Sequence, residues 1–203
     1  MGRVSQAQAA QNRERIVATA ARLFRERGVA GVSVADVMAE AGMTHGGFYK
    51  HFASKDALVA EAVTQAFAEQ ASSIAGRGSA RSDDARTALL EAYLSPTHRD
   101  HPGTGCPSAG FGGDVARAAG GNATRQAYAD GVEAFAHLAG VAGEADLAAV
   151  STMVGALLLS RATAGTELSD RILAAAREAL ISPAEAHSAA ASAPSPTAGN
   201  RPA

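Results

Sequence analysis

Between residues 44 and 55 the sequence gathers side chains that can hydrogen-bond around two adjacent glycines. The group consists of Thr44, His45, Gly46, Gly47, Tyr49, Lys50, His51 and Lys55. A hydroxyl or imidazole beside small residues can reach the edges of bases, whereas lysine, tyrosine and histidine side chains can bind phosphate. The pattern therefore indicates contact with a nucleic acid, with Thr44 and His45 reading bases and the later side chains holding the backbone.

A second group of reactive side chains lies at residues 98–106 and includes His98, Asp100, His101 and Cys106. A Cys/His pair can act as nucleophile and base, and two histidines followed by a cysteine can bind Zn²⁺. No oxyanion-hole motif accompanies them, and spacing this loose arises readily by chance. We therefore expect no catalytic residue, no metal site and no cofactor, and a metal sensor remains only an alternative.

Cys106 has a further interpretation as a sensor of oxidants or electrophiles. It is the only cysteine of the chain and directly precedes Pro107 at the expected start of a helix. Backbone N–H groups and the helix dipole at such a position stabilise a thiolate. The competing interpretation is a small buried hydrophobic residue, as free cysteines usually are. Without a second cysteine, reversible oxidation would need another subunit or a small thiol.

The composition is that of a globular protein, with 47% hydrophobic and 19% charged residues among 203. No apolar run approaches the ~18 residues of a membrane-spanning helix, and the N-terminal segment lacks the apolar stretch of a secretory signal. We therefore expect a cytoplasmic protein that does not bind membranes. The net charge of −2 conceals an asymmetry, because residues 1–60 carry eight Lys/Arg against five Asp/Glu. A basic first segment suits an anionic partner.

Three helices are expected to position the first group. Apolar residues at helical spacing predict a helix over residues 12–27. Ser33 and Asp36 form a start resembling a capping box for a second helix, which ends before Gly42, and a third helix is expected over residues 44–51. Two short helices joined by a glycine-containing turn form a helix-turn-helix, in which the second helix enters the major groove of DNA.

The rest of the chain is also expected to be helical. The pattern predicts helices over residues 54–75, 85–94, 107–118, 123–139, 144–164 and 169–181, with a long polar loop over 95–105. We find no pattern typical of strands, so the predicted fold is all-α with about nine helices. We expect a DNA-binding domain over residues 1–53, a larger helical domain over 54–182, and a disordered tail rich in Ala, Ser and Pro over 183–203.

Residues 13–59 also carry a family resemblance. Its matching positions are Ile16, Ala20, Leu23, Phe24, Gly28, Ser33, Val34, Val37, Ala41, Gly42, Phe48, Tyr49, His51, Phe52, Ser54, Lys55, Asp56 and Leu58. In these the segment resembles the N-terminal domain of the TetR/AcrR family of transcriptional regulators. The resemblance implies three N-terminal helices that bind DNA, followed by a domain that binds a ligand and forms dimers. Carried over by position, the DNA contacts are Ser33, Thr44, His45, Gly46, Tyr49, His51 and Lys55, and the helix-turn-helix pattern adds Lys50.

The resemblance further implies a repressor that binds a palindromic operator as a homodimer and is released by a small molecule, although the sequence itself does not separate repression from activation. Candidate walls of a ligand pocket are the large aromatic residues of the second domain, namely Phe67, Tyr93, Phe111, Tyr128 and Phe135. The alternative is that these rings only fill the core. The apolar helices expected over 144–164 and 169–181 suit a dimer interface, with Val154 and Leu158 in the seam.

Overall fold

The computed structural model describes residues 6–76, 83–117, 120–141 and 144–181, and in these ranges every regular element is a helix. The predicted all-α fold is confirmed. The α-helices are α1 Gln6–Arg27, α2 Val34–Glu40, α3 Lys55–Ala75, α4 Asp83–Tyr93, α5 Pro96–Asp100, α6 Pro107–Ala116, α7 Gly121–Ala139, α8 Leu147–Ala162 and α9 Glu167–Ile181. Two 3₁₀-helices, η1 His45–Lys50 and η2 Pro102–Thr104, complete the described elements.

Local signals set the ends of the first helices as expected. Gly28 follows α1 with φ 74°, a left-handed conformation that suits glycine at the end of a helix. At the start of α2 the Ser33 hydroxyl accepts a hydrogen bond from the Asp36 N–H at 3.1 Å, and the Asp36 carboxylate accepts one from the Ser33 N–H at 2.8 Å. Ser54 caps α3 by accepting from the N–H of Ala57 at 3.1 Å.

Two segments differ from the sequence prediction. Residues 45–50 form a 3₁₀-helix instead of an α-helix, because the segment is very short and Gly46-Gly47 weakens α-helix formation. The loop expected over 95–105 contains α5 and η2: Ser95 caps α5 through the N–H of His98, and Pro96 occupies its first turn. Proline is well tolerated there, so Pro96 starts a helix where we expected it to end one. The expected tail over 183–203 lies outside the described residues.

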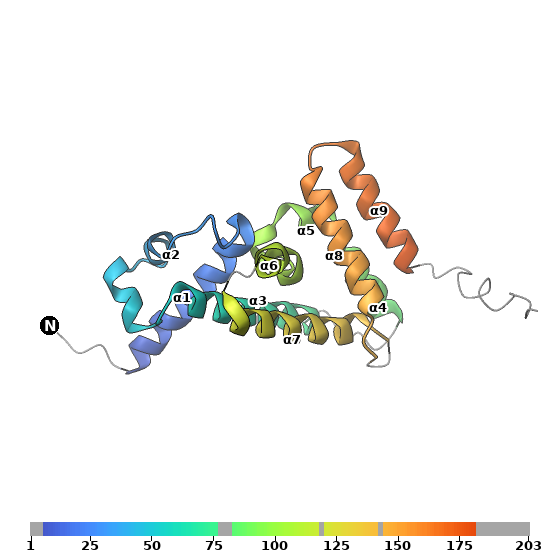
Figure 1. The fold of residues 1–203 in the computed structure, drawn as a ribbon. Coiled ribbons are helices and arrows are strands. Elements are labelled where there is room, and N and C mark those ends of the chain that lie inside the picture. The colour runs from blue at the N-terminus through green and yellow to red at the C-terminus, as the bar shows by residue number, and fades with distance from the viewer. Residues whose placement is uncertain (1–5, 77–82, 118–119, 142–143, 182–203) are drawn as a thin grey trace, which may run out of the picture.

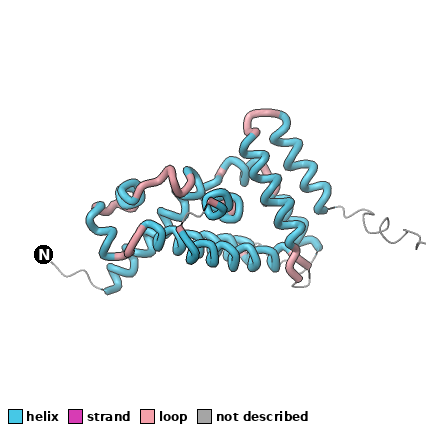
Figure 2. The backbone as a smooth tube through the Cα atoms, viewed as in Figure 1, coloured by secondary structure: helices cyan, strands magenta, loops and turns pink. Residues whose placement is uncertain are grey.

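The helices form an elongated molecule, with the short helices η1 and α2 at one end and α8 and α9 at the other (Figure 1). The long helices α3 and α7 run side by side between them (Figures 1 and 2). Close approach of α3 and α7 depends on Gly131, because a methyl group there would overlap the ring of Phe67. None of the described helices is long and apolar enough to span a membrane.

The buried side chains form two clusters. One surrounds α9 and α8 and includes Tyr93, Cys106 and Phe135. The other contains the helix-turn-helix residues Phe48 and Phe52 but continues along α3 to Phe111 on α6. The expected boundary at residue 53 therefore coincides with the start of α3, whereas the core beneath the first three helices extends past it.

Candidate functional site

The exposed face of η1 rests on two buried phenylalanines. Phe48 is fully buried, and its ring stacks on that of Phe52 with centroids 5.5 Å apart. Tyr49 lies on the opposite side of the same turn with 69% of its surface exposed. Because Phe48 and Phe52 fix the rotation of this short element, its other side chains are directed toward solvent.

The structure brings most of the expected nucleic-acid contacts onto one exposed segment. Thr44, His45, Gly46, Tyr49 and Lys50 are exposed, and His51 is half-buried. Ser33 is exposed at the start of α2, where its hydroxyl is engaged with Asp36. The hydrogen bonds from this hydroxyl and from the Ser33 backbone hold the pKa of Asp36 below its ordinary value.

Lys55 differs from the other expected contacts because its ammonium group is occupied inside the protein. It is half-buried, donates a hydrogen bond to the carbonyl of Val29 at 2.6 Å, and lies 5.8 Å from the centre of the Phe24 ring. In this position it ties the start of α3 to the loop between α1 and α2. Its expected contact with DNA remains a prediction.

Sequence reasoning missed Arg13, which holds α1 against α3 and against Phe52, just after η1. Its guanidinium binds the carboxylate of Glu61 through both terminal nitrogens and stacks over the Phe52 ring at 4.6 Å. The hydrogen bond with Glu61 is the main cause that raises the pKa of Arg13. No local pattern in the sequence announces this contact, since Arg13 and Glu61 lie on different helices.

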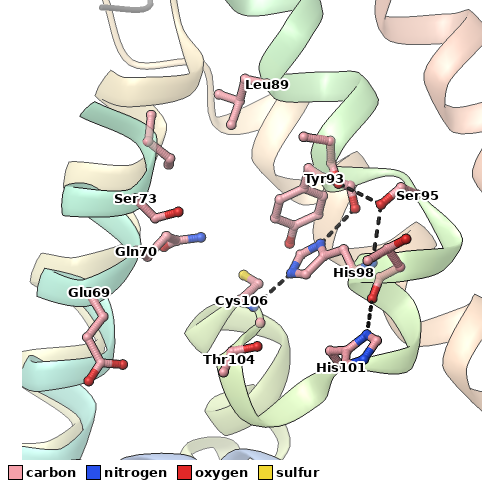
Figure 3. A pocket seen from close by; sticks show the side chains of 14 residues that line it. Glu69, Gln70, Ser73, Leu89, Tyr93, Ser95, His98, His101, Thr104 and Cys106 are labelled. Atoms are coloured by element: carbon pink, nitrogen blue, oxygen red, sulfur yellow. Dashed lines mark hydrogen bonds between the residues drawn. The ribbon is translucent and has the colours of Figure 1, made fainter. Parts of the chain in front are cut away.

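A cavity of about 460 Å³ opens at the other end of α3. Helix α3 lines it with Glu69, Gln70, Ser73 and Ile74, α4 with Leu89 and Tyr93, and the segment of α5 to α6 with His98, His101, Thr104 and Cys106, among others (Figure 3). His98 organises one wall: its Nδ1 lies 2.7 Å from the carbonyl oxygen of Tyr93, and its Nε2 lies 3.0 Å from the Cys106 backbone nitrogen.

Of the five aromatic residues expected to line a pocket, only Tyr93 lies on this cavity. Phe67 and Phe111 are buried in the cluster beneath the helix-turn-helix, and Phe135 is buried behind Tyr93 with the two rings stacked. Tyr128 donates a hydrogen bond to the carbonyl of Ser108 at 2.8 Å. The structure thus places one of the five on the cavity, buries three in the core and leaves Tyr128 half-buried, a distinction that spacing alone does not make.

Cys106 is buried, with 1% of its surface exposed, and stands immediately before α6 on the cavity wall.

The positions of the two histidines bear on the alternative of a zinc site. Both ring nitrogens of His98 face backbone groups, and Nδ1 of His101 lies 2.7 Å from the carbonyl oxygen of Thr97. Within the described ranges no three His, Cys, Asp or Glu side chains gather as a set of metal ligands.

Arg25 connects the cavity with the first helix. This buried residue of α1 donates from Nη2 to the carboxylate of Glu69 at 2.9 Å and from Nη1 to the carbonyl of Gly105 at 3.4 Å. Glu69 and Gly105 both line the cavity. Sequence reasoning did not identify Arg25, because its partners lie 44 and 80 residues away along the chain.

A second connection joins α6 to the same end of α1. The carboxylate of Asp114 accepts a hydrogen bond from the buried N–H of Val29 at 2.9 Å. Because Lys55 binds the carbonyl of Val29, both backbone polar groups of this residue are held by side chains of other helices. Helices α3 and α6 are therefore both bonded to the loop that precedes α2.

Helices α8 and α9 carry most of the large apolar side chains exposed in the described structure. These are Leu147, Leu158 and Leu159 on α8 and Leu168 on α9, each at least 45% exposed. Val154 is half-buried and packs partly against the neighbouring core. These two helices therefore leave large apolar side chains in contact with solvent in the single chain.

Comparisons with known proteins agree with this arrangement. Residues 16–62 match the family model for bacterial regulatory proteins of the tetR family. Over 52 residues, 26% of the chain, the sequence is 40% identical to the uncharacterized HTH-type transcriptional regulator YerO of Bacillus subtilis, and the match spans 18% of YerO.

Solved structures share the whole fold. A TetR transcriptional regulator from Chloroflexus aurantiacus superposes with a TM-score of 0.66 at 25% identity, covering 87% of this chain and 95% of that one. The multidrug binding protein EbrR, complexed with ethidium, gives a TM-score of 0.56 at 24% identity over 82% of this chain and 98% of that one. Residues 16–62 therefore carry the N-terminal domain of the tetR family of bacterial regulatory proteins, and the chain has the fold of a TetR transcriptional regulator.

Proposed function

We propose that this regulator is a repressor that binds a palindromic operator as a homodimer and leaves it when a small molecule occupies the cavity beside α3. One observation carries the proposal. Arg25, on the first helix of the DNA-binding unit, is held by two residues that line the cavity. A ligand that displaces Glu69 or Gly105 therefore changes the position of α1.

In this proposal η1 enters the major groove. Thr44 and His45 contact base edges, Gly46 permits close approach, and Tyr49, Lys50 and His51 bind phosphates, as does Ser33 at the start of α2. Two observations support this assignment: these residues lie at the surface, and no described atom lies within 4 Å of a methyl group placed on Gly46. Lys55 can bind a phosphate only if its ammonium group gives up the hydrogen bond to the Val29 carbonyl.

The dimer is proposed to form through α8 and α9. Two copies of the exposed leucines on these helices would cover one another in a symmetric interface. Such a dimer presents two η1 segments, and the symmetry of the operator should match that of the protein. The expected domain organisation, with DNA binding assigned to residues 1–53 and ligand binding and dimerisation to 54–182, belongs to the same proposal.

Coupling between the two sites follows from the contacts of α1. The cavity meets Arg25 through Glu69 and Gly105, while α6 and α3 hold Val29 through Asp114 and Lys55. A ligand that favours one arrangement of these contacts shifts the spacing of the two η1 segments, typically with a coupling free energy of ~1–3 kcal/mol. The ethidium bound to EbrR, a protein of the same fold, supports a small-molecule ligand.

The experiment is a selection of genomic fragments by the full-length protein, followed by binding of the selected duplex measured by fluorescence anisotropy. We expect an inverted repeat bound by a dimer. His45→Ala should change the preferred bases, whereas Lys50→Ala should weaken binding to all duplexes and lower the salt slope by about 1. Equal affinity for all duplexes at moderate salt would overturn the proposal.

A second candidate, a thiol sensor at Cys106, is favoured by the position of this thiol on the cavity wall before α6. In this function peroxide oxidises the thiol to a sulfenic acid and is itself reduced to water. A thiol of another subunit or a small thiol then condenses with the sulfenic acid to a disulfide, releasing a second water, and a further thiol reduces this disulfide back to the Cys106 thiol. Operator binding is measured before and after peroxide for the native protein and for Cys106→Ser. Release of the native protein alone supports the sensor; continued binding, or equal release of both, refutes it.

A further inference from the structure

The wall of the cavity includes a buried hydroxyl that lacks a hydrogen bond. Only 5% of the surface of Tyr93 is exposed, and its hydroxyl makes no hydrogen bond of ordinary geometry within the described part of the chain. In Figure 3 this hydroxyl ends beside Cys106 and the His98 ring, which line the cavity with it. Burying a hydroxyl without a partner is costly, so the group is prepared to donate to something that enters the cavity.

The neighbouring side chains on the same wall satisfy one another. The Ser95 hydroxyl donates to the Ala92 carbonyl at 2.8 Å and accepts from the His98 N–H at 3.2 Å. The His98 ring is engaged on both sides, by the carbonyl of Tyr93 and by the N–H of Cys106. The thiol of Cys106 lies near enough to affect the Tyr93 hydroxyl both electrostatically and as a sulfur partner, but the contact falls outside ordinary hydrogen-bond geometry and sulfur is a weak acceptor. An oxygen acceptor would be a better partner for the Tyr93 hydroxyl.

The Glu69 carboxylate and the His98 ring on the cavity wall are already compensated. The carboxylate binds the Arg25 guanidinium at 2.9 Å and accepts from the Gln65 amide at 3.2 Å. Because Nε2 of His98 accepts the Cys106 N–H, the imidazole is neutral with its proton on Nδ1, which donates to the Tyr93 carbonyl. A charged ligand beside Tyr93 would find no opposite charge in either group and would lose its hydration.

Another part of the cavity wall is apolar. Ile74, Leu89 and Ala92 line it, and Ile74 and Leu89 are buried. An apolar ligand body placed against them gains free energy by leaving water, whereas the hydroxyl of Tyr93 orients a polar end.

We infer that the cavity takes an uncharged small molecule with an apolar body and a carbonyl-type oxygen, to which the Tyr93 hydroxyl donates a hydrogen bond. The inference names the chemical class of the effector and so rests on the proposed function of the cavity. Burial is the main cause that raises the pKa of Tyr93 well above its ordinary value. The phenol therefore remains protonated, and able to donate, throughout the neutral pH range.

The test compares four benzene derivatives of similar size on the full-length protein by calorimetric titration. Acetophenone carries a neutral acceptor, ethylbenzene has none, benzoate is an anion and benzylammonium is a cation. We expect acetophenone to bind about 2- to 12-fold more tightly than ethylbenzene, the factor that one net hydrogen bond supplies. Both ions should bind more weakly than acetophenone. No binding by acetophenone, or stronger binding by either ion, would overturn the inference.

Tyr93→Phe isolates the hydroxyl, because it keeps the ring and its packing. We expect this variant to bind acetophenone and ethylbenzene equally, and its melting temperature without ligand to stay the same or rise, since an unpartnered hydroxyl is removed. Tyr128→Phe is the control, because Tyr128 does not line the cavity and its hydroxyl binds the Ser108 carbonyl. An acetophenone advantage that persists in Tyr93→Phe, or a lower melting temperature of this variant, contradicts the inference.

The same variants separate this inference from the proposed function. The probe ranking is measured without DNA, and operator binding is measured without probe. If the native protein does not recognise an operator, the proposed function is wrong, but the order of the probe affinities still tests the class of ligand. A failed ranking with intact operator binding defeats only the class of ligand inferred from Tyr93.

Discussion

Replacing Arg25 tests the connection between α1 and the cavity. Arg25→Met keeps an unbranched side chain of similar width but removes the hydrogen bonds to Glu69 and Gly105. Removing one partner from a fully buried ion pair costs ~3–5 kcal/mol. The Glu69 side chain is 39% exposed and keeps its bond to the Gln65 amide, so it remains partly solvated. We therefore expect a loss of about 1.5–3 kcal/mol in the free energy of unfolding, the range for hydrogen bonds to charged groups.

The assay is urea denaturation of four proteins: the native chain, Arg25→Met, Glu69→Gln and the double variant. If the two side chains stabilise the fold through each other, Arg25→Met costs less in the Glu69→Gln background, with a coupling of about 1 kcal/mol. Arg22→Met is the matched control on the same helix, because Arg22 pairs with Glu26 and Glu40 near the surface. Exposed pairs of this type contribute ~0–1 kcal/mol.

Two results would refute the reasoning about Arg25. One is a decrease in the free energy of unfolding of Arg25→Met that is no larger than the decrease in the Arg22→Met control. The other is an equal loss in the native and Glu69→Gln backgrounds, which would mean that the guanidinium acts through packing or through its bonds to backbone carbonyls, and not through the carboxylate.

Three other substitutions test the remaining surfaces. Gly46→Ala has open space around the added methyl group among the described residues, so calorimetry should show unchanged or higher thermal stability while anisotropy shows weaker operator binding; unchanged affinity would mean that DNA does not approach this backbone. Leu158→Glu places a charge on the exposed face of α8, and sedimentation at micromolar concentration should show a folded monomer beside a dimeric native protein; a monomeric native protein refutes the interface. Burial, followed by the influence of the Cys106 thiol, raises the pKa of Tyr128 to about 12. The neutral Tyr128 side chain therefore contributes fully to the free energy of unfolding below about pH 10, and this contribution is lost as pH rises toward 12. Alkaline denaturation should affect Tyr128→Phe less than the native protein. Identical plots of unfolding against pH for the two proteins contradict this.

Local signals explain which parts of the fold were predictable from sequence. Ser33 and Asp36 lie three residues apart, and Gly28 directly follows α1, so the end of α1 and the start of α2 could be predicted. The short helix α5 was missed because Pro96 is compatible with both the end and the beginning of a helix, and only the Ser95 cap decides between them.

The candidate sites were less predictable, because they depend on contacts between distant residues. The exposure of Tyr49 follows once Phe48 and Phe52 are known to be buried together. The engagement of Lys55 with Val29 depends on the packing of α3 against α1. For the same reason the sequence could not separate Tyr93, on the cavity, from the buried ring of Phe135.

The shared core beneath η1, α3 and α6 has a consequence for the opening motions of the protein. Because Phe48 and Phe111 belong to one continuous set of buried side chains, η1 and α6 should open in the same cooperative event. Slowly exchanging amide protons of α1 and α6 would then have equal free energies of exchange, and both would change together when either helix is destabilised. Residues 1–53 expressed alone would lack the α3 and α6 side of this core and should show no protected amides.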